Sequence, residues 1–179
     1  MGSDPLEPGT LLVAAPSEDA DPIFGRVVVL VVDREPNGIT TGIAVNRPLR
    51  QNVADTAALA LLFVPEPAAP VYWGGPMGDD PAVLAQLTSV DGLEWFHMSK
   101  RQLRPFPLPD VGLIALAEHP EPFESRIRRA HLYIGLCVWD AGQLEEEVEQ
   151  HQWQLAKAKH DDLFRPDPLN LWAELVRER

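Results

Sequence analysis

The sequence has only one cysteine, Cys137, among its 179 residues, which excludes a disulfide within the chain. Cysteine this scarce is typical of proteins from a reducing compartment. Cys137 lies inside residues 132–138, an apolar run with the composition of a strand. A reactive thiolate needs exposure and nearby cations. The run therefore predicts that Cys137 is a buried, small hydrophobic side chain.

Positive charge is also scarce, because 15 basic residues stand against 27 acidic ones and leave a net charge of −12. Such a balance opposes long-range attraction to nucleic-acid phosphates or to anionic lipid. The two densest basic clusters, within residues 100–104 and 126–129, are small enough to be solvated faces. The sequence therefore predicts no specific binding of DNA.

Long apolar runs are missing too, since none reaches the ~20 residues that cross a bilayer. Residues 1–8 have neither the basic leader nor the apolar core of a signal peptide. We therefore expect a cytoplasmic protein with no membrane partner. The 45% hydrophobic content suffices for a core of ordinary size, and no repeat or long linker divides the chain. The sequence predicts one domain over residues 1–179, with a flexible N-terminal segment over residues 1–8.

Familiar catalytic patterns are absent as well. The sequence contains no G-x-S-x-G elbow, no Walker loop and no H-E-x-x-H pair. Its five histidines lie far apart and show no recurrent spacing of metal ligands. The adjacent acidic pairs at residues 79–80 and 161–162 are better explained by capping and solvation than by acid–base chemistry. These observations predict no catalytic residues, no metal and no cofactor, and they favour a protein that is not an enzyme.

Short apolar runs of strand length dominate what is present. Asn37-Gly38, which favours positive φ, separates two of these runs and predicts a β-hairpin over residues 26–45. The valine-rich first arm is typical of a strand that is buried on both faces. The expected strands cover residues 10–15, 26–32, 39–45, 71–73, 83–87, 93–98, 111–117, 131–138 and 153–158.

Helices are expected between these strands. One helix over residues 53–63 would be capped by Asn52, and another would cover residues 120–129. Asp140 and Gln143 have the spacing of a capping box, so a third helix is expected to begin at Asp140 and to turn its glutamates toward water. A terminal helix with an apolar stripe over residues 171–176 would dock on the sheet.

Three corners of the predicted fold, at residues 46–49, 73–76 and 139–145, follow apolar runs and carry polar or glycine-rich chemistry. Loops at strand ends are a common place for function. If the corners converge, they form a small polar pocket with a tryptophan as one wall. The candidate ligand-binding residues are Asn46, Arg47, Gly74, Gly75, Trp139 and Gln143.

The chemistry of the first two corners suits an anion. Arg47 offers a planar fork for a carboxylate or phosphate, and Asn46 offers a donor and an acceptor. Gly74 and Gly75 would expose free amides or allow a second backbone to approach closely. The other interpretation is structural, with the polar side chains bonded to neighbouring carbonyls. A shared site requires that Arg47 and the two glycines lie within contact distance.

An ordered set of motifs covers residues 9–14, 21–26, 42–48, 74–76 and 135–153. Together these motifs resemble the bacterial family named after the YqgE and AlgH proteins. Asp140 and His151 depart from it, since relatives are expected to have glycine and asparagine there. The resemblance implies an α+β fold in which a coiled, partly barrel-like, mostly antiparallel sheet is flanked by helices. It brings no established biochemical activity.

Two functions remain open from the sequence. The first is a non-enzymatic regulatory or adaptor protein that binds a partner protein or a small anionic ligand at the polar corners, and the family's association with gene regulation points to it by analogy. The second is an enzyme of unrecognised type in which Arg47 and Asn46 position a small anionic substrate. The lack of a nucleophile–base pair favours the first.

Overall fold

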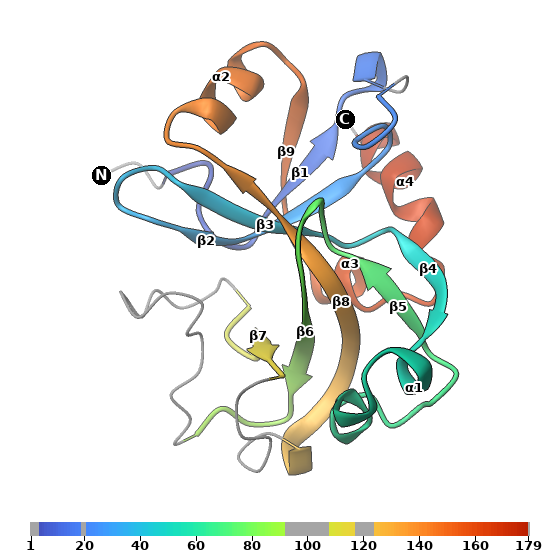
Figure 1. The fold of residues 1–179 in the computed structure, drawn as a ribbon. Coiled ribbons are helices and arrows are strands. Elements are labelled where there is room, and N and C mark those ends of the chain that lie inside the picture. The colour runs from blue at the N-terminus through green and yellow to red at the C-terminus, as the bar shows by residue number, and fades with distance from the viewer. Residues whose placement is uncertain (1–3, 19–20, 92–107, 117–123, 179) are drawn as a thin grey trace.

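A computed structural model of the chain describes residues 4–18, 21–91, 108–116 and 124–178 (Figure 1). These residues form a mixed, mostly antiparallel sheet with short helices around it, so the predicted α+β class is confirmed. The strands are β1 (Thr10–Ala14), β2 (Val28–Arg34), β3 (Thr40–Ala44), β4 (Pro48–Asn52), β5 (Pro70–Trp73), β6 (Met77–Leu87), β7 (Val111–Ala115), β8 (Ile127–Trp139) and β9 (Trp153–Lys157). The α-helices are α1 (Val53–Thr56), α2 (Gln143–Glu149), α3 (His160–Leu163) and α4 (Leu171–Arg177), and the 3₁₀ segments are η1 (Pro16–Glu18), η2 (Ala58–Leu62), η3 (Glu124–Arg126) and η4 (Pro168–Asn170).

The strand order is β4-β5-β8-β3-β2-β1-β9, with β6 paired to β8 and β7 paired to β6. The pairing of β5 with β8 is parallel, and the other pairings are antiparallel. Strands β4 and β9 end this path, so the described part of the sheet is not closed into a barrel. The predicted hairpin is confirmed, because β2 and β3 pair antiparallel around the turn at residues 35–39.

Strand β8 is shared between the two halves of the sheet. Residues Ile127 to Leu136 pair with β6, and Leu132 to Ile134 also pair with β5, whereas the last residues, Cys137 to Trp139, pair with β3. Gly135 lies two residues before the part that pairs with β3 and has φ 76°, a conformation that glycine adopts without a steric penalty. Figure 1 shows β8 running across the molecule from one half to the other. The strand thereby brings the end of β3 and the turn after β5 to the same place.

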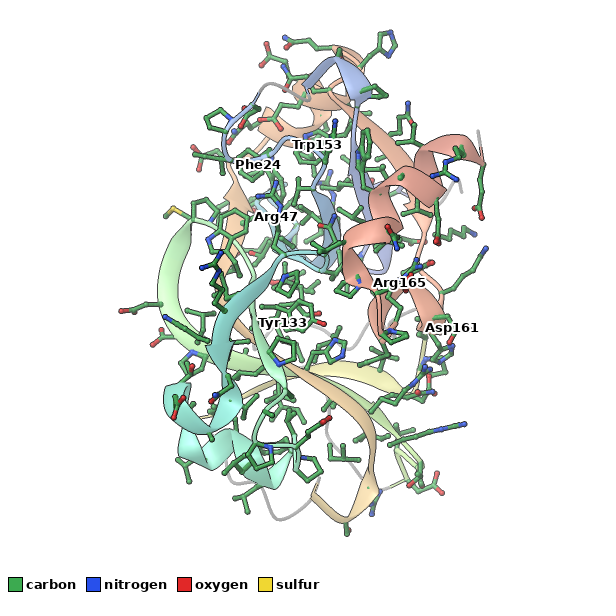
Figure 2. The ribbon with its side chains drawn as sticks, turned by 90° about the vertical axis from the view of Figure 1, so that its right-hand side faces the viewer. Phe24, Arg47, Tyr133, Trp153, Asp161 and Arg165 are labelled. Carbon is green, nitrogen blue, oxygen red and sulfur yellow. The ribbon has the colours of Figure 1, made fainter. Side chains whose placement is uncertain are left out.

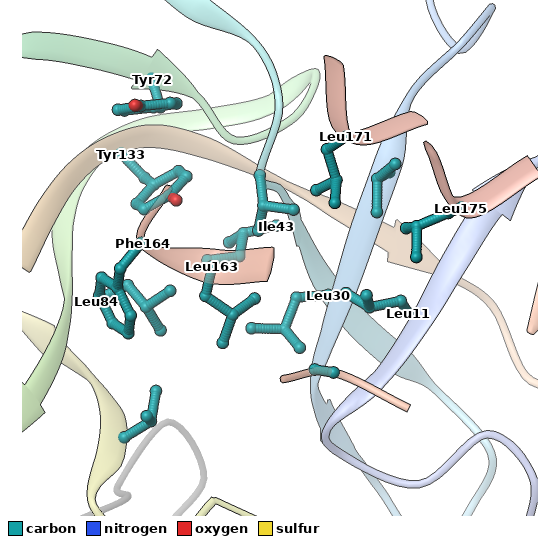
Figure 3. Packing of buried hydrophobic residues seen from close by; sticks show 14 of the residues in the cluster. Leu11, Leu30, Ile43, Tyr72, Leu84, Tyr133, Leu163, Phe164, Leu171 and Leu175 are labelled. Atoms are coloured by element: carbon teal, nitrogen blue, oxygen red, sulfur yellow. The ribbon is translucent and has the colours of Figure 1, made fainter. Parts of the chain in front are cut away.

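The core follows the two-residue period of the strands. Val28 to Val31 are 0% exposed, as predicted for a strand that is covered on both faces. Alternate residues of β1 and β2 contribute to different clusters on opposite faces. One cluster packs under α3 and α4 (Figure 3), and the other packs under α2 and includes Trp139 and Trp153.

Two helix predictions need correction. The helix expected over residues 53–63 is split into α1 and η2, although Asn52 caps α1 as predicted, since its Oδ1 accepts from the amide of Asp55 at 2.9 Å. The helix expected over residues 120–129 is wrong over the residues that the structure describes there. Residues 124–126 form η3 and residues 127–129 begin β8, where the long partner strand β6 extends the ladder. The predicted strand at 93–98 lies outside the described residues.

The N-terminal segment contacts the sheet where it is described. Leu6 is 3% exposed, and Arg34 Nε donates to Asp4 at 2.6 Å. Residues 1–3 lie outside the described part of the chain. Within the described part of the chain, no helix combines the length and the hydropathy that a bilayer span requires.

Candidate functional site

Asn46 follows β3 and uses its side-chain amide inside the protein. Its Oδ1 accepts from the amide of Val28, and its Nδ2 donates to the carbonyl of Arg26, both at 2.9 Å. The residue is 4% exposed. These bonds tie the end of β3 to the start of β2, so Asn46 fits the structural interpretation of this corner.

Arg47 lies beside the second corner. Its guanidinium carbon is 5.8 Å from the centroid of the Trp73 ring, and its Nη2 donates to the carbonyl of Gly25 at 2.7 Å. Burial lowers the pKa of Arg47, and the nearby charge of Asp21 opposes that shift. Arginine keeps its charge at neutral pH in spite of such a shift. The cation is therefore held between an aromatic face, a carbonyl and a carboxylate.

Gly74 and Gly75 let the chain cross directly over β8. The amide of Gly74 donates to the carbonyl of Ile134, and its carbonyl accepts from the amide of Ala44, both at 2.7 Å. A Cβ on Gly74 would overlap the carbonyl oxygen of Gly135, and a Cβ on Gly75 would overlap the backbone of Leu136. The glycines thus provide close backbone approach, and the amide of Gly74 is not free for an anion.

The first two corners lie side by side, as the hypothesis of a shared site requires. The amide of Trp73 donates to the carbonyl of Arg47 at 2.9 Å, and Trp73 immediately precedes Gly74. β8 joins the third corner to them, since Cys137 Sγ lies 3.5 Å from the carbonyl oxygen of Gly74. The fold therefore gathers three corners that are distant in the sequence.

The third corner is built around the carboxylate of Glu147. Trp139 Nε1 donates to Glu147 Oε2 at 2.9 Å, and Trp153 Nε1 donates to the same oxygen at 2.8 Å. Gln143 Nε2 donates to Glu147 Oε1 at 3.0 Å. The two indole rings meet edge to face, with centroids 6.0 Å apart. The sequence predicts that Glu147 lies on the water-facing side of α2. That prediction is wrong, because the Glu147 carboxylate accepts hydrogen bonds from Trp139, Trp153 and Gln143.

Asp140 does not cap α2, which corrects the prediction made from the capping-box spacing. The helix begins at Gln143, and Gly142 occupies the N-cap position with φ 83°. Gln143 reaches back as predicted, since its Oε1 accepts from the amide of Asp140 at 3.0 Å. The Asp140 carboxylate makes no hydrogen bond with any residue that the structure describes. The left-handed glycine replaces the side-chain cap.

A cavity of about 380 Å³ opens at this third corner, and we call it the tryptophan pocket. Trp139 and Gln143 line it, whereas the candidate residues of the first two corners do not. Phe24 and Trp153 meet edge to face at 6.0 Å, and Figure 2 shows them together with Arg47 below Phe24. The lining residues are Ala14, Asp21, Phe24, Pro76, Met77, Cys137, Val138, Trp139, Gln143, Glu147, Gln152 and Trp153.

Among the described lining residues, the titratable groups are two carboxylates and a thiol. Hydrogen bonds from the amides of Phe24 and Ile23 lower the pKa of Asp21, so this carboxylate is ionised at neutral pH. Burial raises the pKa of Cys137 to about 12, and the side chain is 2% exposed. The thiol is therefore protonated, which agrees with the predicted buried hydrophobic role.

Sequence reasoning missed four residues that shape the pocket. Asp21 and Phe24 belong to a loop before β2. Trp153 lies in the edge strand β9, as predicted, but it was not among the predicted site residues. Glu147 stands four residues after Gln143 on α2, a spacing that places both side chains on one helix face. That spacing was the available signal, although it does not reveal the two indoles that the carboxylate binds.

An AlgH-like family model matches residues 11–179. The chain belongs to the AlgH-like family. The UPF0301 protein of Thermobifida fusca is 34% identical to this AlgH-like chain over 174 residues, which cover 96% of the chain and 86% of that relative. The UPF0301 protein of Streptomyces avermitilis is 32% identical over 177 residues, with coverage of 96% and 86%. The resemblance inferred from the sequence motifs is thus confirmed.

Two solved structures share this AlgH-like fold. The crystal structure of protein DIP2367 from Corynebacterium diphtheriae superposes with a TM-score of 0.79 at 23% identity, covering 100% of this chain and 90% of that one. The solution structure of the AlgH protein from Pseudomonas aeruginosa gives a TM-score of 0.63 at 23% identity, covering 99% and 92%. At this identity the likeness concerns the fold alone.

Proposed function

We propose that this AlgH-like protein is a non-enzymatic regulatory or adaptor protein whose tryptophan pocket binds a partner protein. The observation that carries the proposal is the pocket itself, where aromatic rings and a few polar groups converge on one cavity. Concave sites of this composition are typical of ligand recognition. Three lining aromatic residues, Phe24, Trp139 and Trp153, supply the apolar surface.

Exposed apolar side chains at the mouth favour a protein partner over a small molecule. Met77 and Val138 line the pocket and are 52% and 39% exposed. Ile23, which precedes Phe24, is 45% exposed. Grouped apolar residues on a surface are a common mark of protein interfaces.

The lining chemistry supports binding rather than catalysis. Among the described residues that line the pocket, the one thiol is protonated and no histidine stands beside it as a base. The enzyme alternative depended on Asn46 and Arg47 acting together on an anion. The side-chain oxygen and nitrogen of Asn46 both make hydrogen bonds within the protein. Of the two residues, Arg47 alone is therefore left to bind a substrate.

The test is affinity capture from a native cell extract with three forms of the protein as bait. We expect the wild type to retain a partner that Met77→Arg loses, because the substitution places a long charged side chain at the mouth. Leu59→Arg is the matched control, since Leu59 is 63% exposed on η2 and does not line the pocket. A partner that all three baits retain equally would bind elsewhere and would refute the proposal.

A further inference from the structure

We propose that the tryptophan pocket receives an arginine side chain from a basic segment of the partner protein. This inference rests on the proposed function of the pocket, and it adds the chemistry of the group that is bound. The charged lining residues within the described structure, Asp21 and Glu147, are both acidic. A guanidinium pairs with carboxylates through its fork of N–H donors and also stacks on aromatic faces. The pocket offers both kinds of contact in one cavity.

Each carboxylate keeps unused acceptor capacity. Oδ1 of Asp21 accepts from the amides of Ile23 and Phe24, both at 2.8 Å, whereas its Oδ2 has no hydrogen bond with any described residue. Oε2 of Glu147 accepts from two indoles, and among the residues that the structure describes its Oε1 accepts only from Gln143. An ionised carboxylate has about four acceptor positions. A guanidinium entering the pocket therefore finds acceptors that the protein has not already used.

The two tryptophans line the cavity with little exposed surface, and Phe24 is the more accessible of the three aromatic residues. Both indole N–H groups are committed to Glu147, which leaves neither indole N–H for an anion. The faces of aromatic rings carry partial negative charge and attract cations. The same bonds hold the rings of Trp139 and Trp153 in place before any ligand arrives. An anionic group would meet two carboxylates and three aromatic rings, so the pocket disfavours it.

The positive charge of Arg47 interacts with the carboxylate of Asp21, although Arg47 does not line the pocket. It donates to the carbonyl of Gly25 and lies over the ring of Trp73, so it is held away from the cavity by its own contacts. Its charge offsets part of the attraction of Asp21 for a ligand. Glu147 and the aromatic rings line the same cavity.

The apolar mouth and the charge of the whole chain indicate what surrounds this arginine in the partner. The exposed side chains of Met77 and Val138, which line the pocket, can pack against the aliphatic stem of an arginine and against its apolar neighbours. The net charge of −12 favours the approach of a basic segment. The occupant that fits is therefore an arginine flanked by apolar residues within a basic peptide segment.

The test uses four short peptides that differ only at their central residue, which is arginine, citrulline, lysine or glutamate. Citrulline keeps the shape of arginine without its charge. Binding is measured by calorimetry and by the NMR signals of the Trp139 and Trp153 indole N–H groups. We expect the arginine peptide to shift both signals and to bind about tenfold more tightly than the citrulline peptide. Lysine should be intermediate, and glutamate should not bind.

The outcomes separate this inference from the proposed function. Citrulline or glutamate binding in the pocket as tightly as arginine would overturn the inference and leave the pocket as a binding site. If no peptide shifts the indole signals, the inference is also wrong, and the capture experiment with Met77→Arg then decides the proposed function by itself.

A variant pair tests the charge directly. Asp21→Asn keeps an oxygen for the amides of Ile23 and Phe24 and removes the negative charge, so folding should be preserved. We expect it to bind the arginine peptide about threefold to tenfold more weakly, with no effect on the citrulline peptide. Asp55→Asn is the control, because Asp55 is exposed on α1 away from the lining residues. Equal affinities of the two variants for the arginine peptide would overturn the inference.

Discussion

Replacing Glu147 with alanine tests whether its carboxylate holds the tryptophan pocket together. The change removes three hydrogen bonds, two from indole N–H groups and one from Gln143. Trp139 and Trp153 are only 4% and 7% exposed, so both N–H groups would be left without a partner in largely buried surroundings. An unsatisfied buried donor costs about 1 to 3 kcal/mol. Water can enter the cavity and satisfy part of this loss, so the low end applies to each indole.

We therefore expect Glu147→Ala to lower the free energy of unfolding by about 2 to 3 kcal/mol. The assay is urea unfolding followed by circular dichroism. Glu149→Ala is the matched control, because Glu149 is an exposed residue of the same helix and should change stability by less than about 0.5 kcal/mol. Glu147→Gln keeps an amide oxygen for the indoles and should lie between the two. Equal stability of the two alanine variants would refute the reasoning.

The remaining predictions concern backbone approach, pH and DNA. Gly74→Ala should lower the melting temperature more than Gly78→Ala, because a Cβ at 74 overlaps the Gly135 carbonyl, whereas a Cβ at 78 meets nothing within 4 Å and is opposed only by the φ of 71° there. Equal melting would contradict this. Burial lowers the pKa of His131 from 6.5 to about 4, so the unfolded chain binds the proton first and stability should fall as pH drops from 6.5 toward 4. His131→Phe should flatten that fall in acid titrations, and an unchanged slope would contradict it. The protein should show no sequence-specific complex with duplex DNA at physiological salt, and a salt-sensitive nanomolar complex on one sequence would disprove this.

The strands of the core were predictable because their signal is local. The valines of β2 and the turn at Asn37-Gly38 determine a buried hairpin without reference to the rest of the chain. The start of β8 was not predictable in this way. Ile127 to Arg129 look helical in isolation, and their strand conformation comes from pairing with β6, about 40 residues earlier in the chain.

The candidate site was predictable only in part, since its contacts join distant segments. Trp139 and Gln143 were identified from the corner in which they lie, and both line the pocket. Glu147 looked like one of several solvated glutamates, because nothing near it in the sequence shows that two indoles donate to its carboxylate. Asp21 lines the same pocket from a loop that precedes Trp139 by more than a hundred residues in the sequence. Tertiary contacts of this kind determine which polar residues face the cavity.

Strand β8 has a consequence for how motion would spread through the protein. Residues Leu132 to Ile134 are bonded to β5 on one edge and to β6 on the other, and the same strand ends at Trp139 in the wall of the pocket. A strand that is paired on both edges is rigid along its length. A ligand that immobilises Trp139 should therefore slow amide exchange at the centre of β8 as well. Ligand binding in the pocket would then reduce backbone motion in the half of the sheet that the ligand does not contact.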